Sequence, residues 1–320
     1  MIRLSARHAV VQAEGRRWRC TLRKSLFHQM AAYTRPVAVG DRVAIRIFGP
    51  RDAVIEKVFD RRSCLAREHK ITGRQQVIVA NVDQVVVTVS LAQPPLRRGI
   101  IDRLLVAAER EEVPALIVFN KCDLVPEREP FEEVARIYRA IGYPVLFTSA
   151  VTGEGVEELR SRLEGLTTVL AGHSGVGKSS LLNAVQPGLK LKVGEISSKW
   201  GKGRHTTTAV SLLPLEGGGF VVDTPGFRSF GIVGLEKWQV GLLFPEIKAI
   251  APGCHYPTCT HTHEPECAVK RALEEGRIDP ERFESYLRIV EGEEDLLFDE
   301  DEEEEDVMDT TPETDAGERA

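Results

Sequence analysis

Residues 172–179 read Gly-His-Ser-Gly-Val-Gly-Lys-Ser, and this stretch decides the fold of the middle of the chain. It fits the pattern of a phosphate-binding loop, in which a short spacer separates a first glycine from Gly-Lys-Ser. An apolar run at 168–171 precedes it and a helix is predicted over 178–185, which is the context that the motif requires. A plain glycine-rich turn, the alternative, does not explain that context.

Each residue type in this loop has a chemical reason to be there. The glycines let backbone N–H groups turn towards phosphate oxygens, and the N-terminus of the following helix favours anions. Lys178 is predicted to reach the β- and γ-phosphates, and the Ser179 hydroxyl is predicted to bind Mg²⁺. The loop therefore predicts a bound nucleotide with a magnesium ion.

Strand and helix patterns alternate around this loop. Strands are predicted at 84–91, 115–119, 145–147 and 168–171, and helices at 99–111, 131–141 and 156–163. Such alternation implies a parallel sheet with helices on its faces. Ligands bind such sheets at the carboxyl ends of the strands.

Two further motifs follow predicted strands and indicate which base is bound. Asn120-Lys121-Cys122-Asp123 ends the strand 115–119, and Thr148-Ser149-Ala150 follows the next one. The Asp123 carboxylate accepts two hydrogen bonds from the donor edge of guanine, and adenine offers no matching pair. The backbone N–H of Ala150 is predicted to contact the same base. The candidate base-binding residues are Asn120, Lys121, Cys122, Asp123, Ser149 and Ala150.

Residues that respond to the γ-phosphate are predicted further along the chain. Asp223-Thr224-Pro225-Gly226 follows a predicted strand, which places Asp223 to hold Mg²⁺ through water and the Gly226 N–H to contact the γ-phosphate. Residues 203–208 read Gly-Arg-His-Thr-Thr-Thr in a long loop, and one threonine is expected to supply a second hydroxyl to Mg²⁺. Thr207 is the candidate, and Thr206 and Thr208 remain open.

The order of these motifs is permuted. The base motifs at 120 and 149 precede the phosphate-binding loop at 172, the threonine loop at 206 and the Asp-Thr-Pro-Gly motif at 223. Ordinary GTPases begin with the phosphate-binding loop. A parallel sheet tolerates the permutation because the new chain ends lie at its surface.

The ends of the chain differ from the middle in pattern and in charge. Short β-type runs at 9–13, 18–22 and 43–48 predict a small all-β barrel or sandwich. Residues 1–70 hold 16 Lys and Arg against 6 Asp and Glu, whereas residues 291–320 hold 1 against 16. This asymmetry indicates a polyanion partner at the basic end, with RNA as the leading candidate, and a solvated, disordered acidic tail. The predicted phosphate contacts are Arg16, Arg17, Arg19, Arg23 and Lys24.

A cluster of cysteines and histidines follows the α/β region. Cys254, Cys259, His261 and Cys267 form a C-x4-C-x-H-x5-C pattern, which matches a closed tetrahedral zinc site. Four protein ligands leave no open position, so one structural Zn²⁺ per chain is predicted. His255 and His263 are alternatives to His261 on spacing alone.

The permuted order, the loop at 172–179, Gly-Arg-His-Thr-Thr-Thr, Asp-Thr-Pro-Gly-Phe and the Cys/His spacing together resemble the RsgA family of circularly permuted GTPases. The resemblance extends to about residue 290. It implies an OB-fold RNA-binding domain at 1–70, a circularly permuted GTPase domain at 71–243, and a small zinc-binding domain with helices at 244–292. The acidic tail at 293–320 lies outside the family pattern, and Glu266 replaces a glycine expected before the last cysteine.

The resemblance also implies a function and a set of contacts. The family hydrolyses GTP to GDP and phosphate and assists late maturation of the small (30S) ribosomal subunit, with 16S rRNA as a partner. It favours His261 as the fourth zinc ligand. The implied phosphate contacts are Gly172, His173, Ser174, Gly175, Val176, Gly177, Lys178, Ser179 and Ser180.

The sequence offers a hypothesis for catalysis. Phe227 follows the Asp-Thr-Pro-Gly motif where Ras-like enzymes carry a water-orienting glutamine, and phenylalanine cannot make that hydrogen bond. His205 in the threonine loop is the candidate to orient or deprotonate water, and an RNA-facing loop histidine is the alternative. Gly175 stands where potassium-dependent GTPases carry asparagine, so no strong potassium requirement is expected.

Two other classes of protein account for fewer of these motifs than a GTPase does. A non-catalytic, GTP-responsive RNA-binding zinc protein does not need Lys178, Ser179 and Asp223, and a small-molecule kinase does not need Asn120 to Asp123. The sequence has no apolar run of the roughly 18 residues that span a membrane, and no signal-peptide core. We therefore expect a cytoplasmic monomer without disulfides and without membrane contact.

Overall fold

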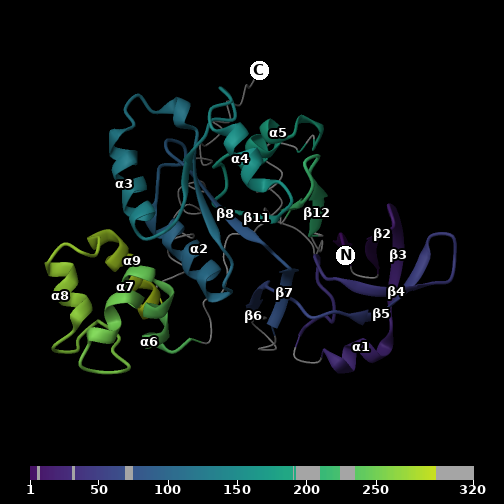
Figure 1. Cartoon of the computed structure of the whole chain (residues 1–320), viewed down its shortest axis with the longest axis horizontal. Helices are drawn as coiled ribbons and strands as arrows, with labels where there is room; N and C mark the ends of the chain where they lie inside the picture. The colour runs from purple at the N-terminus through teal and green to yellow at the C-terminus, as the bar shows by residue number, and fades with distance from the viewer. Residues whose placement is uncertain are drawn as a thin grey trace, which may run out of the picture.

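The computed structural model of the chain describes residues 1–5, 8–30, 33–68, 75–189, 191, 210–223 and 235–292, without the side chains of Arg67, Glu68 and Asp223. A central α/β body lies between an N-terminal β body and a C-terminal helical body (Figure 1). The loop with His205 and Thr207, the residues Gly226 and Phe227, and the acidic tail lie outside the described residues.

One mixed sheet of eleven strands runs through the described part of the central and N-terminal bodies. Its order is β10-β9-β8-β11-β13-β12-β1-β2-β3-β5-β4. The first five are parallel: β10 (Val145–Phe147), β9 (Ala115–Asn120), β8 (Gln84–Ser90), β11 (Thr167–Ala171) and β13 (Phe220–Asp223). The antiparallel strand β12 (Ser211–Pro214) follows them. The predicted parallel α/β sheet is confirmed.

Helices cover both faces of the parallel strands. The helices α2 (Arg98–Arg110) and α3 (Glu129–Ala140) pack on one face, where Val87 of β8 shares a core cluster with Ile101 and Tyr138. The helices α4 (Val156–Leu163) and α5 (Lys178–Val185) pack on the other face, where Val86 lies with Leu159. All residues of β8 are buried, as expected for a strand covered on both sides.

The N-terminal body continues the same sheet. The pair Arg3↔Ser211 joins β1 (Arg3–Leu4) to β12, and β2 (Ala9–Ala13), β3 (Arg16–Leu22), β5 (Asp52–Val58) and β4 (Val43–Ile47) follow. Helix α1 (Lys24–Gln29) places Leu26 in a core with Trp18 and Ile55. A separate hairpin, β6 (Cys64–Glu68) and β7 (Gln75–Ala80), spans residue 70 and is linked to the β body by bridges from Tyr33 and Val39.

The C-terminal body consists of short helices around Phe244 and Tyr286. They are α6 (Lys237–Val240), α7 (Pro245–Ile250), α8 (Ala268–Glu274) and α9 (Pro280–Glu291). Arg282 of α9 is buried and donates hydrogen bonds to Asp102 of α2 at 2.7 Å and to Glu246 of α7 at 2.8 Å. This ion cluster fixes the helical body to the central sheet. No helix in the described part of the chain is long and apolar enough to cross a membrane.

Candidate nucleotide-binding site and metal centre

The predicted nucleotide motifs meet at one edge of the sheet. They follow the carboxyl ends of β9, β10, β11 and β13, which are all members of the parallel part of the sheet. The edge therefore collects segments that are far apart in the chain. The permuted order does not disturb this arrangement, because the sheet position of each strand matters and its place in the chain does not.

The phosphate-binding loop needs its glycines at two positions. Gly172 and Gly177 have φ values of 145° and 92°, which side chains rarely adopt. A Cβ on Gly172 would lie 2.0 Å from the backbone oxygen of Thr88, and one on Gly177 would lie 2.5 Å from Nδ2 of Asn120. The Lys178 ammonium donates to the carbonyl oxygens of Gly172 and His173 at 2.7 and 2.6 Å. The loop therefore curls around its own lysine.

Asn120 ties the base motif to the phosphate-binding loop. Its side-chain N–H donates to the backbone oxygen of Val176 at 2.8 Å, and its Oδ1 accepts a hydrogen bond from the Thr148 hydroxyl at 3.0 Å. Asn120 and Thr148 are both buried. Asn120 was predicted from the sequence as a base-binding residue, and in the structure its side chain joins three motifs.

Around the expected base position, Asp123 is exposed and Ala150 is half-buried. Lys121 has a left-handed backbone with φ of 61°, and its ammonium donates to the carbonyl of Gln93. Partial burial lowers the pKa of Lys121. The Ser149 hydroxyl accepts hydrogen bonds from the next turn and shapes the loop that carries Ala150.

Two residues that sequence reasoning missed lie beside this region. The Cys122 thiol donates to a carboxylate oxygen of Glu154 at 3.4 Å, and Arg128 donates to both oxygens of that carboxylate at 2.6 Å. Nothing in the local sequence signals this contact, because the three residues come from separate segments of the chain.

The structure describes some of the residues that are predicted to hold Mg²⁺. Ser179 lies in the first turn of α5 and is 6% exposed, which suits a hydroxyl that binds a cation beside the phosphates. The backbone of Asp223 ends β13 at the same sheet edge. The side chain of Asp223 and the residues Thr207 and Gly226 lie outside the described residues.

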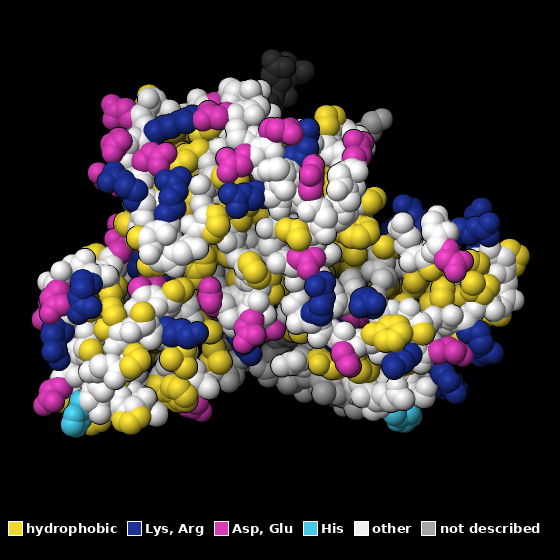
Figure 2. Space-filling view, viewed as in Figure 1, with side chains coloured by type: hydrophobic (Ala, Val, Ile, Leu, Met, Phe, Trp, Pro, Cys, Tyr) yellow, Lys and Arg dark blue, Asp and Glu magenta, His cyan; other side chains and the backbone are white. Residues whose placement is uncertain are grey.

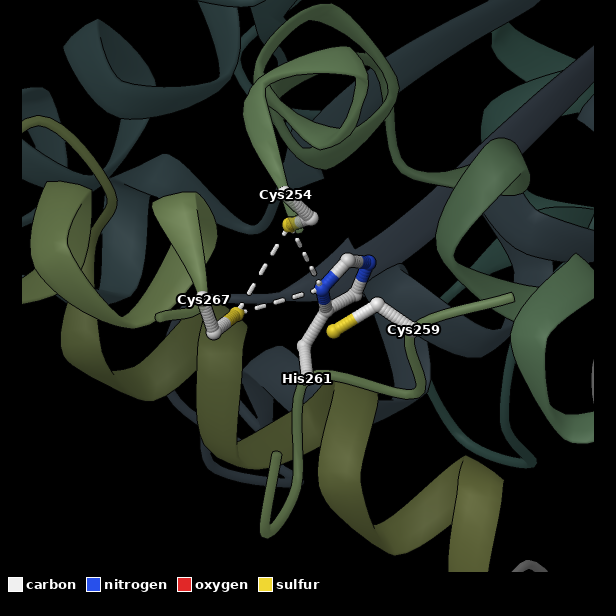
Figure 3. A group of neighbouring side chains, drawn as sticks. All are labelled: Cys254, Cys259, His261 and Cys267. Carbon is white, nitrogen blue, oxygen red and sulfur yellow. Dashed lines mark hydrogen bonds between the residues drawn. The ribbon is translucent and has the colours of Figure 1, made fainter. Parts of the chain in front are cut away.

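The structure brings the four predicted metal ligands together (Figure 3). The Sγ atoms of Cys254 and Cys267 lie 3.8 Å apart, and His261 Nδ1 lies 3.6 and 3.4 Å from them. A tetrahedral ion with Zn–S of about 2.3 Å and Zn–N of about 2.0 Å requires roughly 3.8 Å between sulfurs and 3.5 Å between sulfur and nitrogen. All four ligand atoms lie within 4.8 Å of one another, so the group fits one tetrahedral metal ion.

The two alternative histidines have other neighbours. His255 is exposed and its Nδ1 lies 3.8 Å from the Glu266 carboxylate, while His263 Nδ1 lies 2.9 Å from the Thr262 hydroxyl. Glu264 braces the loop, because its carboxylate accepts hydrogen bonds from the N–H and hydroxyl of Thr260. The other cysteines, Cys20, Cys64 and Cys122, are free thiols.

A parallel sheet with a phosphate-binding loop and an Asn-Lys-x-Asp motif at one edge, in this chain order, defines a circularly permuted P-loop GTPase. Residues 58–233 match the family described as RsgA GTPase. The chain belongs to this family, and it is a GTP hydrolase.

Similar proteins agree along most of the chain. A protein of Moorella thermoacetica named small ribosomal subunit biogenesis GTPase RsgA is 43% identical over 280 residues, which cover 88% of this chain and 91% of that protein. The crystal structure of YjeQ from Thermotoga maritima superposes with a TM-score of 0.75 at 38% identity, covering 91% of this chain and 96% of that one. The crystal structure of YloQ, described as a circularly permuted GTPase, superposes with a TM-score of 0.70 at 29% identity and covers 92% of this chain and 94% of that one.

Proposed function

We propose that this chain uses GTP hydrolysis in late maturation of the small ribosomal subunit, with 16S rRNA as its binding surface. The observation that carries the nucleotide part is the Asn120 bridge, which joins the base motif to the phosphate-binding loop in one buried network. The ribosomal part is supported by relatives whose names assign them to small-subunit biogenesis.

Each part of the sheet edge has a proposed role. Asp123 and the Ala150 N–H bind the base, the loop from Gly172 to Ser180 binds the phosphates, and Gly226 contacts the γ-phosphate. Ser179, Thr207 and Asp223 hold Mg²⁺, which neutralises charge on the phosphates when it is bound. The glycine conformations support the phosphate role, because they free backbone N–H groups to face anions.

His205 is proposed to orient the attacking water. The support is chemical: Phe227 cannot orient water, and an imidazole beside the γ-phosphate can. The substitution His205→Ala tests the proposal by single-turnover hydrolysis with and without small subunits. Unchanged rates in both conditions would assign this histidine to RNA contact or to solvent.

The N-terminal body is proposed to be an OB-fold that binds rRNA. Lys and Arg side chains are spread over it with apolar groups between them, on the right of Figure 2. A hollow of about 480 Å³ is lined by Arg16, Arg17 and Arg51 beside Trp18. None of these three guanidinium groups pairs with a carboxylate among the described residues, whereas Arg19 pairs with Asp52 at 3.0 Å.

The presence or absence of a carboxylate partner separates the arginines of the N-terminal body as candidates for rRNA binding. Unpaired guanidinium groups are available for phosphate contacts, so Arg16→Gln and Arg17→Gln are expected to weaken rRNA binding and to reduce its dependence on salt. Arg19→Gln is expected to have a smaller effect because its charge is already neutralised by Asp52. Binding that is insensitive to salt would contradict this role for the basic body.

The Cys/His group is proposed to hold one structural Zn²⁺. Three sulfurs and an imidazole are the donor set that zinc prefers, and they leave no open coordination position. The ion would stabilise a small helical body whose apolar core is limited.

We propose that the chain divides into four parts, at residues 1–70, 71–243, 244–292 and 293–320. The β6–β7 hairpin connects the first two parts.

The decisive experiment measures GTP turnover by the purified protein, with ATP as control, with and without small ribosomal subunits. We expect slow basal turnover of about 10⁻⁴ to 10⁻² per second and a stimulation on the order of 10³-fold by small subunits. Binding of small subunits without any stimulation would favour the second candidate, a GTP-responsive RNA-binding zinc protein whose hydrolysis is incidental.

A further inference from the structure

A cluster of three side chains joins the segments that carry the two predicted base motifs. Cys122 belongs to the short 3-10 helix η1 (Cys122–Leu124), Glu154 lies in the turn before α4, and Arg128 precedes α3. The Cys122 thiol donates to Glu154 at 3.4 Å, and both oxygens of that carboxylate accept hydrogen bonds from Arg128 at 2.6 Å. The cluster connects three segments that are separate in the chain.

The cluster connects the two segments that carry the groups proposed to recognise guanine. Asp123 is the neighbour of Cys122 in η1, and Ala150 lies in the loop that ends at Glu154. That loop closes on itself, because the Ser149 N–H donates to the Glu154 carbonyl at 2.9 Å. At its start, the Cys122 N–H donates to the carbonyl of Thr148 at 3.1 Å. The Ala150 loop is thus fastened to η1 at both ends, once through backbone and once through Glu154.

The charges favour a lasting contact. Hydrogen bonds from Arg128 lower the pKa of Glu154, so its carboxylate stays ionised at neutral pH. Burial, and then the hydrogen bond to Glu154, raise the pKa of Cys122 to about 11. The thiol therefore keeps its proton and remains a donor, and it is a poor nucleophile or redox group at neutral pH.

We propose that Glu154 and Arg128 are positioning residues for guanine recognition. They hold the Ala150 loop against η1, so that Asp123 and Ala150 can bind the same purine ring. The inference rests on the proposed role of Asp123 and Ala150. Preorganised recognition groups bind more tightly because no ordering cost falls on the binding step.

A second ion pair supplies a matched control. Glu284 and Arg288 of α9 lie 2.6 Å apart, and their side chains are 59% and 45% exposed, against 44% and 40% for Glu154 and Arg128. This pair belongs to the helical body and not to η1 or the Ala150 loop. Glu284→Gln therefore makes the same chemical change as Glu154→Gln away from the base.

The experiment measures dissociation constants for GDP and ADP by titration calorimetry or competition, and kcat and KM for GTP. For Glu154→Gln and Arg128→Gln we expect GDP to bind about two- to five-fold more weakly, the range for a partly exposed ion pair. ADP, which lacks the edge that Asp123 binds, is expected to keep its affinity. KM for GTP is expected to rise while kcat at saturation stays unchanged, and Glu284→Gln is expected to match the wild type.

Two substitutions of Cys122 give an independent test. Cys122→Ser keeps a donor for Glu154 and is expected to retain more GDP affinity than Cys122→Ala. The double variant Glu154→Gln, Arg128→Gln is expected to lose no more than either single variant, because both act through one contact.

Two results would overturn the inference. GDP affinity equal to the wild type in Glu154→Gln and Arg128→Gln would show that guanine recognition does not need the contact between Glu154 and Arg128. An equal loss for GDP and ADP would show a general effect on the loop at 172–179. If the wild-type chain itself bound GDP and ADP alike, the proposed role of Asp123 and Ala150 would be refuted. That result differs from one in which the wild type prefers GDP and the variants keep their affinity.

Discussion

Arg282 offers the sharpest test of how the helical body is attached. Its guanidinium is 2% exposed, and the carboxylates it contacts, Asp102 and Glu246, are 0% and 8% exposed. The ring faces of Phe244 and Tyr138 lie 4.8 and 5.4 Å from it. Replacing Arg282 with methionine therefore leaves two buried carboxylates without their cation.

The expected cost follows from that burial. Removing one partner of a buried ion pair typically costs about 3–5 kcal/mol, because the remaining charge stays desolvated. Arg136→Ala is the control: Arg136 pairs with Glu129 on α3, but their side chains are 62% and 77% exposed. Such a pair contributes about 0–1 kcal/mol. The two arginine variants should therefore differ by at least about 2 kcal/mol in the free energy of unfolding.

The assay combines urea unfolding with hydrogen exchange. The midpoint of unfolding is expected to fall for Arg282→Met, and amides of α9 are expected to exchange faster than those of β8. Replacing Asp102 and Glu246 by leucine and methionine in the same variant is expected to recover part of the loss, since apolar side chains tolerate burial. An Arg282→Met variant as stable as Arg136→Ala would refute the reasoning.

Three further predictions concern the site and the metal loop. Gly172→Ala is expected to abolish GTP binding, measured by calorimetry, because its Cβ would overlap the Thr88 carbonyl at 2.0 Å. Asp123→Asn is expected to shift hydrolysis from GTP towards xanthine nucleotides, measured as the ratio of kcat/KM values. Burial alone would raise the pKa of Glu264, but hydrogen bonds from Thr260 bring it down to about 2. A depressed pKa stabilises the fold above the unfolded value of about 4.3 and loses that contribution as pH falls towards 2. Glu264→Gln should therefore lower Tm at pH 7 and differ less from the wild type near pH 2.

The regular elements of the central body were predictable because their signals are local. The strand 145–147 and the helices 156–163 and 178–185 were predicted with the bounds that the structure has. Each contains apolar residues close together in the chain, so local sequence suffices. The hairpin β6–β7 and strand β12 were missed. The pairing of β12 with β1 joins residues far apart in the chain, whereas β6 with β7 and β12 with β13 are pairs of neighbouring strands.

The candidate site divides in the same way. The spacing of Cys254, Cys259, His261 and Cys267 predicted a group that the structure assembles, since metal ligands must converge on one point. The choice of His261 over His255 and His263 could not come from spacing. It depends on the folded loop, in which His261 is 2% exposed and the other two point to different neighbours. Likewise, Glu154 carries no sequence signal, because its role arises from contact with a distant turn.

The permuted order places the Asp-Thr-Pro-Gly motif at 223–226 directly before the helical body. Asp223 ends β13, and residues 224–236 lead from it to α6 of the helical body. That body is held on α2 by the Arg282 cluster, so both ends of the connecting segment are fixed to the same sheet. Breaking this buried ion cluster requires more free energy than a change of conformation in a connecting segment.

A change of nucleotide is therefore expected to alter residues 224–236 without moving α9. Hydrogen exchange tests this directly: amides of α9 should exchange at the same rate with GDP and with a non-hydrolysable GTP analogue. Peptides that cover 224–236 should differ between the two states. Faster exchange of α9 in one nucleotide state would contradict the argument, because it would show that the Arg282 cluster opens during the cycle and that the helical body moves with it.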